Sequence, residues 1–297
     1  MKPPSADFLL RYEPFGGIIA TEDPPALTFV DKDYIRSLNR PESKRWQEPD
    51  NGILSGPIEA HYAITDYCSL GCAGCYMASS DDPAKLNDKE TDLKHARDIA
   101  KTLKEMQIFH VALGGGESFA IPWFFELAAC FREAGIVPNV TTNGHLITPE
   151  LAAQCRVFGQ VNVSMDSVSV DSSGSRPDNH FAEADKAIRL LQENGIRTGI
   201  NCVITKHNYQ ELESLIAYAR KRKIIDIEFL RFKPSGRGKD IYDDMKLTQE
   251  QVVELYPFLR KLARRYRVSL KLDCSFTPFL CYHRPPKDVL EYFAIMG

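Results

Sequence analysis

Six short apolar segments alternate with amphipathic ones between residues 57 and 232, and this alternation constrains the fold more than any other feature. The apolar segments, which we expect to form strands, are residues 58–65, 109–113, 137–142, 161–165, 198–205 and 225–232. The segments between them, which we expect to form helices, are residues 89–105, 122–134, 149–157, 181–193 and 209–221. This repeat predicts parallel βαβ units in an α/β fold. A partial barrel and an open doubly wound sheet both remain open, and both gather ligands at the carboxyl ends of their strands.

Two flanking regions differ from this repeat, so we divide the chain into residues 1–55, 56–240 and 241–297. The first region is rich in proline, and its apolar stretches 15–20 and 26–30 predict a β-hairpin attached to the main domain. A short helix follows at 31–38. The last region predicts an amphipathic helix over 247–266 and then a strand over 268–272.

Composition excludes several classes of protein. The net charge of −3 argues against a general nucleic-acid binder, which carries a strong basic excess. No apolar run approaches the roughly 18 residues that span a bilayer, and no signal-peptide pattern is present. We therefore expect a cytoplasmic protein that binds neither nucleic acid nor membrane. Thiols stay reduced in the cytoplasm, so the eight cysteines indicate metal binding or catalysis rather than disulfides.

Three cysteines lie together directly after the first predicted strand. Cys68, Cys72 and Cys75 have the spacing C-x3-C-x2-C, and Gly71 and Gly74 allow the loop between them to curl tightly. A 4Fe–4S cluster normally binds four cysteines, so three ligands would leave one iron open for chemistry. A structural zinc site is the main alternative, although zinc sites usually show a second Cys/His pair. Three small buried side chains are the other alternative.

This spacing resembles the signature of the radical S-adenosylmethionine (SAM) superfamily, whose fold is a partial (β/α)6 TIM-like barrel. Many members have an aromatic residue before the third cysteine, whereas this chain has Gly74 there and Tyr76 after the cysteine. The resemblance implies that Cys68, Cys72 and Cys75 hold a 4Fe–4S cluster. It also implies that SAM binds the open iron and is cleaved to a 5′-deoxyadenosyl radical, which abstracts hydrogen from a substrate. Tyr76 would contact the SAM adenine through its backbone.

Further strand ends match the same family. Gly115, Gly116 and Glu117 follow the second strand and resemble the GGE element that binds the amino group of SAM. Thr142 and Asn143, at the end of the third strand, are expected to shape the floor of the pocket. Taken alone, this glycine run also suits an ordinary strand-to-helix turn, because glycine permits close backbone approach.

The later strands supply the remaining candidates. Ser164 and Asp166 resemble an S-x-D element near the SAM ribose and carboxylate, and Arg176 resembles an arginine that meets the carboxylate. Strand-end caps and a solvated surface arginine are the alternatives. Val203 and Leu230 are candidate pocket residues, although buried strands place apolar residues there anyway. Asn201 and Arg231, on the same two predicted strands, are candidate pocket residues as well. His61 and His110 have no metal-ligand partner at helical spacing, so we expect structural histidines whose hydrogen bonds are satisfied.

The two ends of the chain resemble one subgroup of the superfamily. Cys274 and Cys281 lie where a SPASM or twitch extension begins, and this resemblance implies auxiliary iron–sulfur clusters. Two cysteines are too few for a whole cluster site, so a truncated extension and ordinary thiols remain alternatives. The N-terminal hairpin resembles that of maturases of ribosomally made peptides, including the Nif11-type maturases and the tyramine-excising spliceases.

Three functions follow from these observations. The first is a radical SAM peptide maturase, whose outcomes include cross-linking, epimerisation and backbone excision. Its implied partners are a precursor peptide, a separate leader-binding protein and a reductant such as flavodoxin or ferredoxin. The second is a radical SAM enzyme of cofactor or tetrapyrrole biosynthesis. The third is a non-catalytic metal-binding scaffold, which would give Glu117 and Ser164 no purpose.

Overall fold

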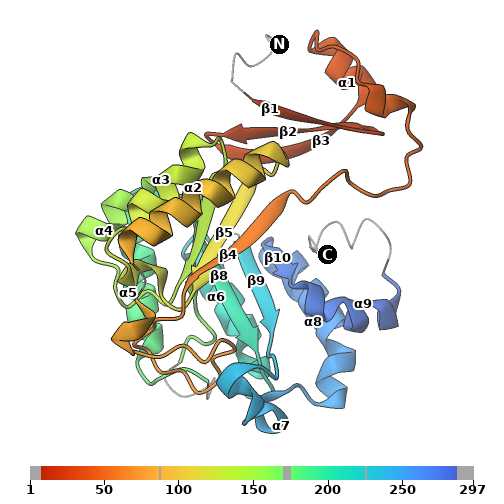
Figure 1. Ribbon diagram of the computed structural model, residues 1–297. Coiled ribbons are helices and arrows are strands. Elements are labelled where there is room, and N and C mark those ends of the chain that lie inside the picture. The colour runs from red at the N-terminus through yellow and green to blue at the C-terminus, as the bar shows by residue number, and fades with distance from the viewer. Residues whose placement is uncertain (1–7, 87, 170–174, 225, 286–297) are drawn as a thin grey trace.

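A single parallel sheet forms the centre of the molecule in the computed structural model, which describes residues 8–86, 88–169, 175–224 and 226–285 (Figure 1). Its strands lie in the order β10-β9-β8-β7-β6-β5-β4. Their bounds are β4 Glu59–Thr65, β5 His110–Gly115, β6 Val137–Thr142, β7 Val161–Ser164, β8 Thr198–Ile204, β9 Asp226–Arg231 and β10 Ser269–Leu272. Each new strand pairs beside the previous one, which is the topology of repeated βαβ units.

The sheet has seven parallel strands, one more than the six that we predicted for the βαβ repeat. The strand expected over 268–272 forms β10, which pairs in parallel with β9. Parallel pairing needs a crossover of a dozen or more residues, and α8 (Gln249–Tyr266) provides it. The prediction failed because we assigned this helix and strand to a separate C-terminal extension.

The sheet curls into a half-barrel. Burial chiefly raises the pKa of Glu228 on β9, and the charge of Glu59 on β4 raises it further. Four strands separate β4 from β9 in the sheet, so these carboxylates interact only because its two sides approach each other. The predicted partial TIM-like barrel is confirmed.

Helices cover the outer face of the half-barrel (Figure 1). They are α2 Lys89–Glu105, α3 Phe124–Glu133, α4 Pro149–Gln154, α5 His180–Glu193, α6 Leu212–Lys221 and α8. The apolar stripe Leu212, Leu215, Ile216 and Ala219 of α6 is buried in the main core cluster, which also contains strand residues such as Val111 and Ile200. Shorter helices are α1 Lys32–Ser37, α7 Tyr242–Met245 and α9 Thr277–His283. No helix in the described ranges is long and apolar enough to cross a membrane.

Single turns of 3-10 helix occur at the connections. They are η1 Lys44–Gln47, η2 Pro83–Lys85, η3 Ser118–Ala120, η4 Cys155–Val157, η5 Tyr209–Glu211, η6 Gly236–Lys239 and η7 Cys274–Phe276. The predicted helices over 149–157 and 209–221 therefore each contain one such turn beside a shorter α-helix.

The N-terminal attachment is a three-stranded antiparallel sheet rather than a two-stranded hairpin. Its strands are β1 Leu9–Glu13, β2 Gly16–Glu22 and β3 Pro25–Asp31, in that order across the sheet. It lies over the amino ends of the parallel strands, away from their carboxyl ends (Figure 1). The prediction missed β1 because two of its five residues, Arg11 and Glu13, are charged.

A buried ion pair fixes this attachment to the barrel. Arg11 is 1% exposed and donates to Glu13 at 2.8 Å, to Pro57 O at 2.6 Å and to Gly56 O at 2.9 Å. Arg11 also donates to Gln107 O at 3.2 Å, which lies between α2 and β5. One guanidinium therefore joins β1 to two segments at the amino ends of β4 and β5.

Candidate metal centre and cofactor site

The three cysteines lie on the loop that leaves β4, at the carboxyl ends of the parallel strands. Cys68 N donates to Ser80 O at 2.8 Å, and Cys75 N donates to Cys72 O at 3.3 Å. Arg237, from η6, also holds this loop, because its Nε donates to Cys72 O at 2.9 Å. All three thiols are half-buried and form no disulfide. Backbone contacts therefore shape the loop, and its sulfur atoms stay free to bind a metal.

Position 74 has no room for a side chain. A Cβ built on Gly74 would lie 2.7 Å from Cε2 of Phe232 and 3.0 Å from Cβ of Ser175. The ring of Phe232, which follows β9, therefore occupies the space beside Gly74. The Tyr76 side chain is 56% exposed. Its contact with adenine remains a prediction.

The Gly115-Gly116-Glu117 segment packs directly on the residues that lead to Cys68. A Cβ on Gly116 would lie 2.0 Å from Tyr67 O, and Gly115 has a left-handed φ of 121°. Gly116 N donates to Thr65 O at 2.6 Å, and Glu117 N donates to Tyr67 O at 2.7 Å. Only glycine allows this approach, so the run is a structural requirement of the cysteine loop.

Glu117 is buried and joins the ends of β5 and β6. Its carboxylate accepts from Thr142 Oγ1 at 2.8 Å, from Asn143 N at 2.8 Å and from Phe119 N at 3.3 Å. Burial raises the pKa of Glu117, and these three donors lower it in part. Asn143 Nδ2 in turn lies 3.7 Å from the sulfur of Cys68. Thr142, Asn143 and Glu117 therefore form one unit with the cysteine loop, and binding of the SAM amino group by Glu117 remains a prediction.

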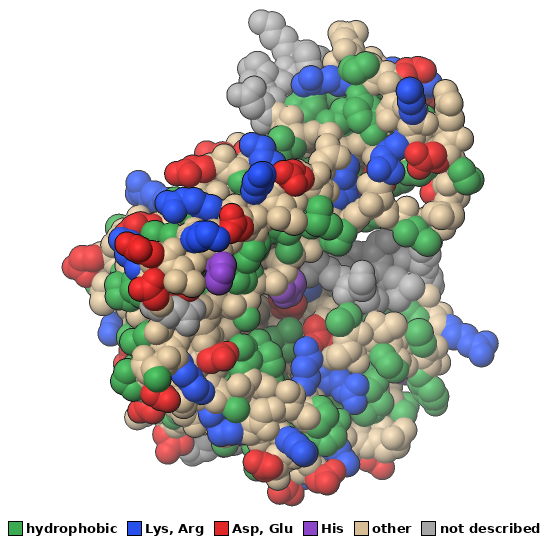
Figure 2. All heavy atoms as spheres, in the orientation of Figure 1, with side chains coloured by type: hydrophobic (Ala, Val, Ile, Leu, Met, Phe, Trp, Pro, Cys, Tyr) green, Lys and Arg blue, Asp and Glu red, His purple; other side chains and the backbone are tan. Residues whose placement is uncertain are grey.

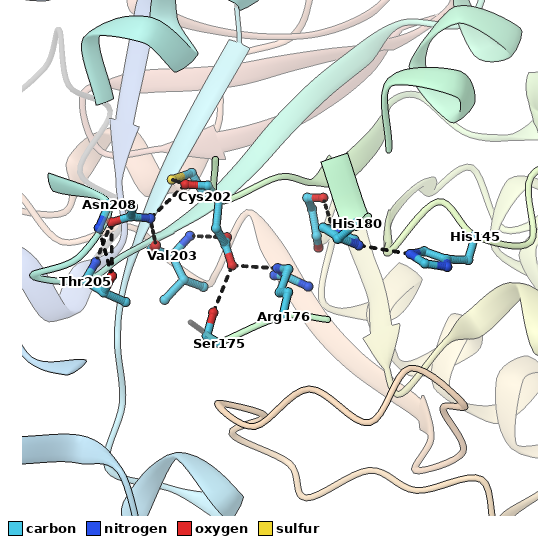
Figure 3. A network of polar contacts seen from close by, with 10 residues as sticks. His145, Ser175, Arg176, His180, Cys202, Val203, Thr205 and Asn208 are labelled. Atoms are coloured by element: carbon cyan, nitrogen blue, oxygen red, sulfur yellow. Dashed lines mark hydrogen bonds and ion pairs between the residues drawn. The ribbon is translucent and has the colours of Figure 1, made fainter. Parts of the chain in front are cut away.

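Asp166 accepts hydrogen bonds from two segments, one after β7 and the other on β8, whose residues Ser175, Arg176 and Val203 are labelled in Figure 3. Its carboxylate accepts from Arg176 Nε at 2.6 Å, from Ser175 Oγ at 3.3 Å and from Val203 N at 2.8 Å. The Arg176 side chain is only 16% exposed, so the alternative of a solvated arginine is wrong. Burial raises the pKa of the Cys72 thiol, and the Arg176 guanidinium opposes that rise. Arg176 therefore lies within electrostatic reach of the cysteine loop.

Neighbouring strands bring the remaining candidates together in pairs. Ser164 lies opposite Asn201, and Val203 lies opposite Leu230. Asn201 alternates with core residues of β8, so its side chain points into the half-barrel, where its Nδ2 donates to Thr141 Oγ1 at 3.1 Å. These residues line the inner face near the carboxyl ends.

The histidine expectations were only partly correct. His61 is exposed and lies 3.2 Å from Glu59, as a structural histidine would. His110 Nε2 is buried and has no hydrogen-bond partner among the described residues, so the expectation of a satisfied histidine is wrong. Sequence reasoning also missed His145 and His180, whose ring nitrogens lie 3.0 Å apart although 35 positions separate them. No spacing rule connects residues so far apart.

Comparison with known families identifies the chain. Residues 62–219 match the family model described as "Radical SAM superfamily". The chain belongs to the radical SAM superfamily. This match begins on β4 and ends on α6, and it contains the whole cysteine loop and the carboxyl ends of β5, β6, β7 and β8.

Curated radical SAM relatives include two kinds of enzyme. The chain is 31% identical over 210 residues to the mycofactocin maturase MftC of Mycolicibacterium smegmatis, which covers 69% of this chain and 52% of the relative. It is 25% identical over 231 residues to an AdoMet-dependent heme synthase of Methanosarcina barkeri, covering 75% and 63%. The chain thus spans about half the length of the maturases it matches.

Among solved structures, Streptococcus suis SuiB bound to its precursor peptide SuiA has a TM-score of 0.63. The identity is 19%, and the superposition covers 92% of this chain and 72% of SuiB. At this identity the likeness shows a shared fold, and it extends beyond the 62–219 match to nearly the whole chain.

The cysteine loop fits the cofactors of the superfamily, a 4Fe–4S cluster and SAM. Thiolates are the usual ligands of iron–sulfur clusters, and each thiolate of a cubane binds a different iron. The sulfur atoms therefore need not converge on one point, and within the described ranges no three His, Cys, Asp or Glu residues form a site for a single ion. Cys274 and Cys281 are both exposed, on η7 and α9. Their binding of an auxiliary cluster remains a prediction.

Proposed function

We propose that this radical SAM enzyme modifies a ribosomally made precursor peptide after abstracting a hydrogen atom from it. The observation that carries the proposal is the 31% identity to the mycofactocin maturase, which extends over 69% of the chain. The heme synthase match is weaker, at 25% identity. Cross-linking, epimerisation and backbone excision, including tyramine removal, are the modifications that we consider.

The inner face of the half-barrel supports a substrate rich in hydrogen-bonding groups. Asn201 alternates with core residues of β8 that face the helices, so its side chain points inward. Its buried Oδ1 atom has no hydrogen-bond partner in the described part of the chain. Buried polar atoms without partners are costly, which favours a ligand that satisfies them. A peptide backbone offers N–H groups that can donate to this oxygen.

The surface supports the same proposal. Figure 2 shows the face of the molecule that carries both the N-terminal sheet and the half-barrel. Acidic, basic and apolar side chains are intermixed on this face, and no region of one charge dominates it. Such a surface suits a peptide better than a polyanion.

The residues of the site supply orientation, and the cofactors supply the radical chemistry when bound. The ion pair of Asp166 with Arg176 fixes the segment after β7 beside the cysteine loop. Val203 and Leu230 provide an apolar surface on β8 and β9 against which an adenine ring can pack. Burial of Glu117 and Asp166 excludes water from the strand ends.

The experiment uses anaerobically reconstituted enzyme with SAM, dithionite and the peptide encoded by a short reading frame beside its gene. The proposal predicts a mass change in the peptide that appears together with 5′-deoxyadenosine. Addition of flavodoxin, ferredoxin or a separate leader-binding protein tests those proposed partners. Formation of 5′-deoxyadenosine with an unchanged peptide, but with conversion of an iron porphyrin, would replace the proposal with tetrapyrrole chemistry.

The auxiliary cluster is a separate part of the proposal. Cys274 and Cys281 would each supply one ligand, and other ligands would come from outside the described residues. The double substitution Cys274→Ser and Cys281→Ser should then lower the iron content to about four atoms per chain, the content of one cubane. An iron content that is the same before and after substitution contradicts an auxiliary site at these cysteines.

A further inference from the structure

Two histidines stack beside the SAM site without being part of the family motifs considered above (Figure 3). His145 lies in the loop after β6, and His180 is the first residue of α5. Their ring centroids are 5.2 Å apart, and the ring planes differ by 14°. Nε2 of His145 lies 3.0 Å from Nδ1 of His180. His180 is 6% exposed, so this contact is sheltered from water.

The surroundings decide which nitrogen carries each proton. His180 Nε2 lies 2.8 Å from the carbonyl oxygen of Ser164, and a carbonyl only accepts. His180 Nε2 therefore carries the hydrogen, and its Nδ1 is the acceptor when the ring is neutral. His145 Nε2 must then donate to that Nδ1. The pair is thus a chain of two donors that points from His145 toward Ser164.

This chain connects the cysteine loop with the end of β7. At one end, His180 binds the carbonyl of Ser164, two residues before Asp166. At the other end, His145 N donates to Asn143 Oδ1 at 2.9 Å, and Asn143 Nδ2 reaches the sulfur of Cys68 at 3.7 Å. Two strand ends that flank the SAM site are therefore joined through imidazole rings.

We propose that His145 and His180 are positioning residues for SAM, which hold Ser164 and Asp166 at the end of β7 in place relative to the cysteine loop. The proposal rests on the cofactor of the superfamily and not on the peptide substrate. If the histidines do not position SAM, the proposed peptide modification can still be correct. If the enzyme does not modify a peptide, the role of the histidines can still be correct.

Burial, together with the nearby Arg176, keeps both rings in the required neutral form. Burial is the main cause that lowers the pKa of His180 to about 4, and Arg176 and His145 lower it further. Asp166 and the Ser164 carbonyl act in the opposite direction. Burial and Arg176 also lower the pKa of His145, against the charge of Glu183. A second proton on His180 would convert its Nδ1 into a donor that faces the donor of His145.

The test measures SAM binding to the reconstituted enzyme by equilibrium dialysis, with no peptide and no reductant. His180→Leu removes the donor to Ser164 and should raise the Kd of SAM about tenfold, the effect of losing one buried hydrogen bond. His180→Gln places its amide nitrogen near the position of Nε2, so it should restore most of the affinity. His145→Phe keeps the stacked ring without the donor and should raise the Kd by a smaller factor.

His283→Leu is the matched control, because His283 Nε2 also donates to a backbone carbonyl, that of Val253 at 2.7 Å, on the far helices α8 and α9. This variant should bind SAM as the unsubstituted enzyme does. If His180→Leu does not fold, His145→Phe and His180→Gln still decide the question. Unchanged SAM affinity in His180→Leu or His145→Phe would overturn the proposal, as would a loss in His180→Gln as large as that in His180→Leu.

Discussion

Gly74 illustrates how a single residue limits the cysteine loop. Its missing side chain leaves space for Phe232, whose Cε2 would lie 2.7 Å from any Cβ at this position. We predict that Gly74→Ala lowers the free energy of unfolding by about 1–3 kcal/mol, the usual cost of overpacking. Gly114→Ala is the control, because no atom lies within 4 Å of its Cβ position. Equal stability of the two variants in denaturant titrations would contradict this account.

His180 gives the folded protein a dependence on pH. Burial lowers its folded pKa from 6.5 to about 4, so the unfolded chain binds this proton first as the pH falls. The contribution of neutral His180 to the free energy of unfolding is complete above pH 6.5. It is lost as the pH falls toward about 4. The linkage relation gives a loss of about 3 kcal/mol over that window.

The measurement is the free energy of unfolding at several pH values for the unsubstituted enzyme and His180→Gln. Glutamine does not titrate, so its curve should be flatter between pH 6.5 and about 4. Parallel curves for the two proteins would show that His180 does not carry this dependence.

Local motifs in the sequence identified most residues of the site but not their partners. Cys68, Cys72 and Cys75 lie within one short segment of the sequence, so their spacing alone indicated a cluster site. The contacts of Glu117 with Asn143 join strand ends 26 positions apart, and no local pattern encodes them. The histidine pair escaped detection for the same reason.

At the scale of elements, Arg11 determines how the N-terminal sheet attaches. Arg11→Met would leave the carboxylate of Glu13, which is 0% exposed, buried without its cation. We predict a loss of about 3–5 kcal/mol in the free energy of unfolding, the usual effect of breaking a buried ion pair from one side. The measurement is chemical denaturation.

A matched control tests whether burial is the cause. Arg36 also pairs with a carboxylate, that of Asp33 at 2.7 Å, but both side chains are largely exposed. Arg36→Met should therefore change stability by less than about 1 kcal/mol. A similar loss in both variants would show that burial of the Arg11 pair does not determine its effect.

Periodicity predicted the elements well where one face is apolar and less well where it is not. α2 spans Lys89–Glu105, the range predicted from the sequence. The strand β1 was missed because its inward-facing residues are an ion pair, which tertiary contacts satisfy and a single sequence does not reveal. β10 was detected as a strand, but its place in the parallel sheet depends on the crossover by α8.

At the scale of the whole molecule, the alternation of strands and helices predicted parallel units but left closure of the sheet undecided. The resemblance to the radical SAM superfamily indicated a partial barrel, and the proximity of Glu59 to Glu228 confirms the curl. The Oδ1 atom of Asn201 on the inner face, which is unpartnered among the described residues, became visible only in the folded structure.

The central claim is that the cysteine loop holds a 4Fe–4S cluster that acts on SAM. The most direct test measures iron and acid-labile sulfide after anaerobic reconstitution, followed by 5′-deoxyadenosine formation with dithionite. We predict at least about four irons per chain and SAM cleavage. Cys72→Ala should lose the iron of this cluster and the cleavage of SAM. Cys130→Ala should retain both, because the Cys130 thiol is buried in the core and not on the cysteine loop. Zinc in place of iron, or SAM cleavage that persists in Cys72→Ala, would contradict the account.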